Sequence, residues 1–84
     1  MIQHVEDHDL PTRVLTRSWA GAIVAGTLPP YEGARLLWRA WSELLRPDDL
    51  TVFVGLASEW EDDPAHRDEY EQDILEAARN YLGL

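Results

Sequence analysis

Histidines and carboxylates near the amino terminus form the cluster best suited to bind a metal ion. His4 and His8 are four residues apart, which would place two imidazoles on one face of a helix, and Glu6, Asp7 and Asp9 could add oxygen ligands. A metal site also needs fixed ligands and a second shell of hydrogen bonds, which a chain terminus rarely provides. We therefore expect no cofactor or metal, and metal binding by His4 and His8 is the third hypothesis for the function.

Candidates for catalysis lie in the second half of the chain. Asp63 and His66 have the carboxylate-x-x-histidine spacing of di-iron bundles, but that chemistry needs two such units and further inward carboxylates. A second candidate is an acidic turn that contains Glu59, Glu61, Asp62 and Asp63. This turn could act as general acid and base only if burial raised the pKa of one carboxyl group, and a charged turn between helices normally faces water. We expect a protein that is not an enzyme.

The formal charge is unevenly distributed along the chain. Residues 1–42 hold four acids and four arginines, whereas residues 43–84 hold twelve acids and three arginines, so the net charge of −9 belongs to the second half. Such a field repels nucleic-acid phosphates and anionic lipids and attracts basic proteins. We expect a protein partner with a basic surface, and neither nucleic acid nor a membrane.

Acidity combined with aromatic residues indicates a protein-binding module. In small acidic inhibitors, such as bacterial immunity or antitoxin proteins, charge sets the encounter rate and a few aromatic rings supply affinity. The predicted partner-binding residues are Trp60, Glu61, Asp62, Glu69, Tyr70, Asp73 and Glu76. Trp60, between two glutamates at a helix end, is predicted to be the exposed tryptophan.

Composition limits the fold and the compartment. The 84 residues suffice for one domain with a small core, and the absence of cysteine excludes disulfides and thiolate sites. The first residues are acidic where a secretory signal would be basic, and the longest weakly polar stretch, residues 19–28, is about half of a membrane span. We expect a cytoplasmic protein.

Prolines divide the sequence into four stretches, each with apolar residues at helical spacing. Helices are predicted from Pro11 to about residue 26, from Pro29 and Pro30 to about residue 45, from about residue 48 to 60, and from Pro64 to about residue 82. Gly26 and Gly83 mark helix ends. The prediction is an all-α bundle of four short helices, with a single domain over residues 10–84 and a disordered tail over residues 1–9.

The third stretch is ambiguous because residues 50–54 are rich in β-branched side chains, which favour a strand. A lone strand would leave its backbone hydrogen bonds unpaired, and no other segment is a suitable partner. Leu50, Phe53 and Ala57 also keep helical spacing, and Asp48 or Asp49 could cap the helix. We therefore prefer a helix for this stretch.

The tryptophans are predicted to be the main anchors of the core, because each can bury on the order of 150–250 Å². They are Trp19, Trp38, Trp41 and Trp60. The first two helices are also net neutral and rich in small residues. A homodimer or larger bundle formed through these helices, with no catalytic function, is the second hypothesis.

Overall fold

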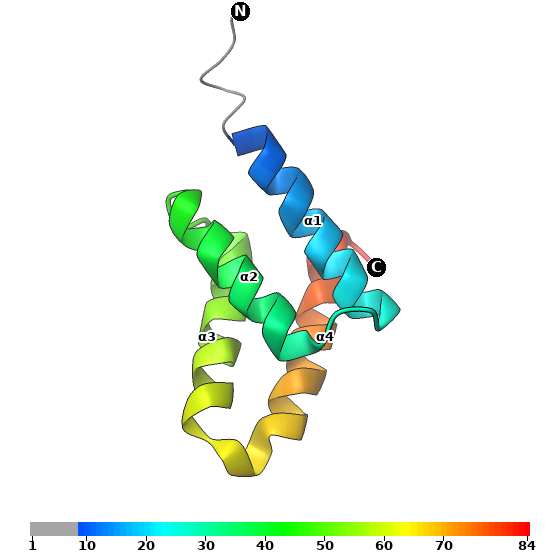
Figure 1. Cartoon of the computed structure of the whole chain (residues 1–84), viewed down its shortest axis with the longest axis vertical. Helices are drawn as coiled ribbons and strands as arrows, with labels where there is room; N and C mark the ends of the chain where they lie inside the picture. Colours follow the sequence, from blue (N-terminus) through cyan, green and yellow to red (C-terminus); the bar gives the residue numbers. More distant parts are fainter. Residues whose placement is uncertain (1–8) are drawn as a thin grey trace, which may run out of the picture.

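The computed structural model describes residues 9–84, which form four α-helices and one short 3-10 turn (Figure 1). These elements are α1 (Asp9–Ala25), α2 (Pro30–Glu43), α3 (Asp48–Asp62), the 3-10 turn η2 (Pro64–His66) and α4 (Arg67–Leu82). No strand occurs within residues 9–84, so the all-α prediction is confirmed, including the helix over residues 50–56. The tail predicted over residues 1–9 lies outside the described residues, except for Asp9, which begins α1.

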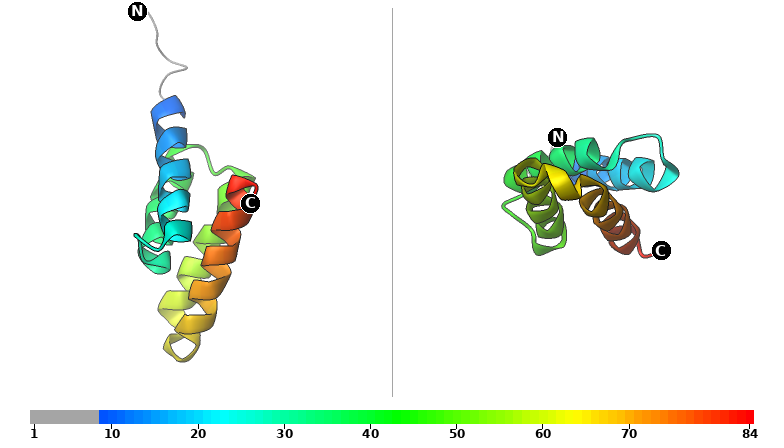
Figure 2. Two further views of the ribbon diagram at one scale, coloured as in Figure 1. Left: turned by 90° about the vertical axis from the view of Figure 1, so that its right-hand side faces the viewer. Right: turned by 90° about the horizontal axis from the view of Figure 1, so that it is seen from below.

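The helices run alternately down and up the molecule and form two layers. α1 and α2 make one layer, while α3 and α4 make the other, as the right-hand view of Figure 2 shows. α2 packs on α3, α1 packs on α4, and neighbouring helices within each layer also touch. The hairpin of α3 and α4 extends beyond α1 and α2 at the end where η2 lies (Figure 1).

The core consists of aliphatic side chains and alanines with a single aromatic ring. Its members are Ala20, Ile23, Ala34, Leu37, Ala40, Leu50, Phe53, Ala57, Ile74 and Ala78. Half of them are alanine, which lets the helices approach closely and leaves little room between them for an indole. The prediction that tryptophans anchor the core is therefore wrong: all four are half-buried, and three of them pack against its edge.

Gly33 on α2 lies in close contact with the side chains of Ile23 on α1 and of Leu28 in the loop between them. A Cβ atom on Gly33 would lie 2.5 Å from Cδ1 of Ile23 and 3.1 Å from Cδ2 of Leu28. Atoms of real side chains do not come that close, so the position requires glycine unless Ile23 moves. A side chain at position 33 would therefore force the buried side chain of Ile23 to shift.

The turn between α2 and α3 has an unusual backbone. Leu45 and Arg46 have φ angles of 65° and 61°, in the left-handed region that normally favours glycine. The N–H of Arg46 donates to the carbonyl oxygen of Trp41 at 2.8 Å, which is the six-to-one bond of a Schellman cap. Leu45 thus stands where a cap normally has glycine, and it is 90% exposed. Gly26 and Gly83, which were predicted to mark helix ends, take the left-handed conformation at the ends of α1 and α4.

The predicted cap of α3 and the predicted start of α4 differ from the structure. Neither Asp48 nor Asp49 caps α3: Pro47 occupies the cap position without a side-chain bond, and both acids lie in the first turn, where the helix dipole favours them. Pro64 opens η2 instead of α4, which begins at Arg67. Asp63 occupies the cap position of η2 and makes no side-chain cap bond.

Candidate functional site

The two layers differ strongly in charge. Residues 9–43, which form α1 and α2 and the loop between them, carry three acids and four arginines, a net charge of +1. Residues 48–82, which form α3, η2 and α4, carry eleven acids and two arginines, a net charge of −9. The charge asymmetry along the sequence has therefore become an asymmetry between two faces of the molecule.

The outer face of α4 presents a row of carboxylates. Glu69, Asp73 and Glu76 are spaced by four and three residues, so they follow one another along the same side of the helix. All three are exposed, and no salt bridge within residues 9–84 involves any of them. Asp62, at the end of α3, is exposed as well. These four predicted partner-binding residues are accessible to another molecule.

Trp60 is held between two other side chains. The ring of Tyr31 stacks on it with centroids 3.7 Å apart and planes inclined by 12°, and the guanidinium of Arg67 lies 3.8 Å from its centroid. Two groups this close cannot share one face of the indole, so both faces are covered. Its Nε1 also donates to Glu71 at 3.0 Å. The prediction that Trp60 is the exposed tryptophan is therefore wrong, and the ring instead joins α2, α3 and α4.

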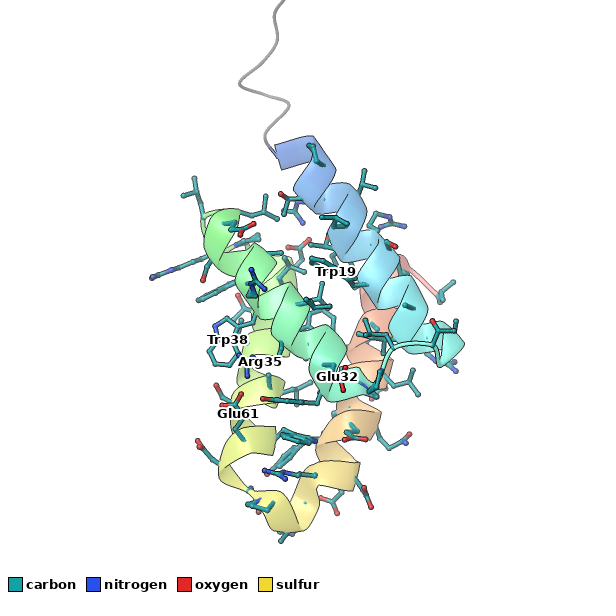
Figure 3. All side chains as sticks on the ribbon, in the orientation of Figure 1. Trp19, Glu32, Arg35, Trp38 and Glu61 are labelled. Atoms are coloured by element: carbon teal, nitrogen blue, oxygen red, sulfur yellow. The ribbon has the colours of Figure 1, made fainter. Side chains whose placement is uncertain are left out.

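Glu61 is engaged within the molecule as well. It accepts hydrogen bonds from the hydroxyl of Tyr31 and, at 3.2 Å, from Arg35, which also donates to that hydroxyl at 3.0 Å. The spacing of Glu32 and Arg35 is typical of a pair within one helix, but Arg35 bonds across to α3. Figure 3 shows Arg35 of α2 and Glu61 of α3 close together, with Trp38 next to them.

Tyr70 closes a small network around Asp63. Its hydroxyl donates to Oδ2 of Asp63 at 2.8 Å, and Nδ1 of His66 lies 2.8 Å from the same oxygen. The hydrogen bonds from Tyr70 and His66 lower the pKa of Asp63. The same bond to Asp63, together with desolvation, raises the pKa of Tyr70 to about 12. Asp63 and His66 thus stabilise the start of α4, and three of the seven predicted binding residues, Trp60, Glu61 and Tyr70, make contacts within the chain.

Hollows in the surface beside α2 were not found from the sequence. One of about 450 Å³ is lined by Arg35, Trp38, Arg39, Ser42, Glu43 and Glu61. A second of about 370 Å³ is lined by Leu28, Tyr31, Glu32, Arg35, Leu36 and Arg39. A third of about 240 Å³ is lined by Leu15, Trp19, Leu36, Arg39, Ala40 and Glu43. Helical spacing places Arg39 on the outer side of α2, but the hollows depend on neighbouring helices, which that spacing does not specify.

The metal-binding hypothesis rests on His4 and His8, which lie outside the described residues. Within residues 9–84, no group of three or more histidine and carboxylate side chains is placed to hold a metal ion. In the same part of the chain, none of the helices has the length and apolar character that crossing a bilayer requires.

Comparison of the chain with models of known protein families, with functionally curated proteins and with solved structures gives no match. The function must therefore be argued from the geometry and charge of the surfaces described above.

Proposed function

We propose that this protein is a binding module whose acidic layer, formed by α3 and α4, docks on a basic surface of another protein in the manner of a small acidic inhibitor. The observation that carries the proposal is the exposed row of Glu69, Asp73 and Glu76 on α4, which has no salt-bridge partner within residues 9–84.

Asp73 and Glu76 do not stabilise the helix that carries them. Like charges three or four residues apart on an exposed helix face destabilise it by about 0.2–0.5 kcal/mol per pair. The helix dipole favours acids only in the first turn, which includes Glu69 but not Asp73 or Glu76. A partner that supplies arginine or lysine side chains would relieve this repulsion, so these carboxylates have a physical role in a complex that they lack in the monomer.

The aromatic rings of Trp60 and Tyr70 contribute in a different way from the prediction, in which they contact the partner directly. Trp60 and Tyr70 are held by contacts within the chain, so they orient α3 and α4 rather than stand free as anchors. Long-range attraction by the carboxylates then dominates recognition, and direct contacts fall to Asp62, Glu69, Asp73 and Glu76. Attraction of this kind raises association rates and weakens with added salt.

Two variants with equal net charge test the proposal. Asp73→Asn/Glu76→Gln neutralises two acids of the row on α4, and Glu32→Gln/Glu43→Gln neutralises two exposed acids on α2, outside the acidic layer. Each tagged variant and the unchanged chain is used to purify proteins from the host, and bound proteins are quantified by mass spectrometry at low and high salt.

We expect a basic protein to bind the unchanged chain and the second variant, to be lost with the first, and to dissociate at high salt. Equal loss with both variants would show attraction by net charge alone. Retention of all bound proteins by the first variant would show that the row on α4 is not the docking surface. Either result overturns the proposal.

A further inference from the structure

We propose that a second copy of this chain docks on the layer formed by α1 and α2, giving a two-fold dimer in which Arg39 of each copy pairs with Glu43 of the other. This inference goes beyond the proposed function, because it concerns the opposite layer and a different partner.

The docking surface is the hollow of about 240 Å³ between α1 and α2. Its apolar part comes from Leu15, Trp19 and Leu36, with Ala40 beside them. Leu15 is 46% exposed, and its neighbour Val14 is 67% exposed. Water therefore contacts large apolar side chains beside a concave surface, which is the kind of surface that binds another protein.

Charge favours a second copy as the occupant. Two copies cannot approach through their α3–α4 layers, because each of these layers has a net charge of −9. The α1–α2 layer has a net charge of +1, so two such layers can meet face to face with little repulsion. Contact through α1 and α2 also leaves the acidic layers on opposite outer sides of the dimer.

The rim of the hollow is complementary to itself. Arg39 and Glu43 both line it, carry opposite charges and lie one helical turn apart on α2. Both are exposed, and within residues 9–84 neither takes part in a salt bridge. A two-fold axis brings the same patch of both copies together, so with the α2 helices antiparallel each Arg39 meets the partner copy's Glu43. One contact is thus repeated on both sides of the axis.

Charge reversal provides a specific test. Sedimentation equilibrium over a wide concentration range is expected to show a reversible dimer for the unchanged chain. Arg39→Glu places two glutamates opposite each other in both contacts, and Glu43→Arg places two arginines there. Each variant alone should weaken dimerisation at least about tenfold. An equimolar mixture should recover the dimer, because every contact between the two variants joins a glutamate to an arginine.

Exposed positions outside the hollow supply the controls. Arg17→Glu changes the net charge as Arg39→Glu does, and Glu59→Arg matches Glu43→Arg, so both controls should dimerise like the unchanged chain. Circular dichroism checks that each variant is folded. A monomer at all concentrations, singly changed variants that dimerise normally, controls as weak as the variants, or a mixture that fails to recover the dimer would each overturn the proposal.

Discussion

The hydroxyl groups of Thr16 on α1 and Tyr81 on α4 lie 2.7 Å apart, joining residues 65 positions apart in the chain. Thr16 is completely buried, and its hydroxyl also donates to the carbonyl oxygen of Arg13 at 2.8 Å. A hydroxyl has one proton to give, so Tyr81 is the donor in the shared bond. The first helix is thus attached to the last by a polar contact as well as by packing.

Removing either hydroxyl should lower stability, and the two effects should not add. We expect Thr16→Val to cost about 1–2 kcal/mol, because it leaves the Tyr81 hydroxyl without this acceptor, and Tyr81→Phe to cost about 1 kcal/mol. In the double variant the loss should be smaller than the sum by about 0.5–1 kcal/mol. Urea unfolding of the four proteins measures this coupling, and additive losses would contradict it.

Adding a methyl group to Gly33 should destabilise the contact between α1 and α2. Because the new Cβ would lie 2.5 Å from Ile23, we expect Gly33→Ala to cost about 1–3 kcal/mol despite the better helix propensity of alanine. Gly55 on α3 is the control, since nothing lies within 4 Å of a Cβ there, and Gly55→Ala should stabilise by about 0.5–1 kcal/mol. Changes of the same sign at both positions would contradict this.

Alanine substitution should distinguish Phe53, the aromatic ring inside the core, from Trp38, an indole at the edge of the core. Phe53 is completely buried, so we expect Phe53→Ala to cost about 3–5 kcal/mol. Trp38 is half-buried and lines an open hollow, so Trp38→Ala should cost less than half as much. Chemical denaturation of both variants provides the comparison. An equal loss of stability in the two variants would support the prediction that tryptophans anchor this fold.

Glycine at position 45 should make the protein more stable. A residue other than glycine in the left-handed conformation costs roughly 1–2 kcal/mol, and the Leu45 side chain is 90% exposed, so little packing would be lost. We therefore expect Leu45→Gly to raise the free energy of unfolding by about 1 kcal/mol, and the melting temperature with it. Leu45→Ala, which keeps the strained backbone, should change stability by less than about 0.5 kcal/mol. Equal effects of both substitutions would show that backbone strain is not the cause.

The bond between Asp63 and Tyr70 should make stability depend on pH at both extremes. The pKa of Asp63 is lowered in the fold, so its contribution is present above its usual pKa of 3.8 and is lost as the pH falls through the lowered value. The pKa of Tyr70 is raised from 10.0 to about 12, so its contribution is complete below pH 10 and is lost as the pH rises toward 12.

Tyr70→Phe should therefore flatten both the acid and the alkaline limb of a plot of unfolding free energy against pH. Asp62→Asn, a change at the neighbouring and exposed carboxylate, should leave both limbs as they are in the unchanged chain. Identical limbs for the unchanged chain and Tyr70→Phe would contradict the role of this bond.

The helices could be predicted because their signals are local. Pro30 lies at the start of α2 and Pro47 just before α3, and the spacing of Leu50, Phe53 and Ala57 identified the buried side of α3. How deeply each side chain is buried could not be predicted in the same way. Helical spacing gives the side on which Trp38 lies, but its burial depends on how closely the neighbouring helices approach. Small residues on several helices, such as Gly33 and the core alanines, allow that approach.

The candidate site was predictable only in its charge. The row on α4 follows from spacing alone, whereas the environment of Trp60 requires Tyr31, which is 29 positions away on α2, and Arg67 beyond η2. The bond from Arg35 to Glu61 likewise joins residues 26 positions apart. Such contacts are properties of the assembled helices, so no single segment shows them.

The uneven charge of the two layers, +1 for the α1–α2 layer and −9 for the α3–α4 layer, gives this small molecule an electric dipole across its thickness. Near a charged body the protein will rotate before any side chain touches, turning its α3–α4 layer toward positive charge. Fewer random orientations then have to be sampled in each collision. This alignment acts over roughly the 10 Å screening length of 0.1 M salt and shortens to about 3 Å at 1 M, so concentrated salt would make the protein approach its neighbours in any orientation.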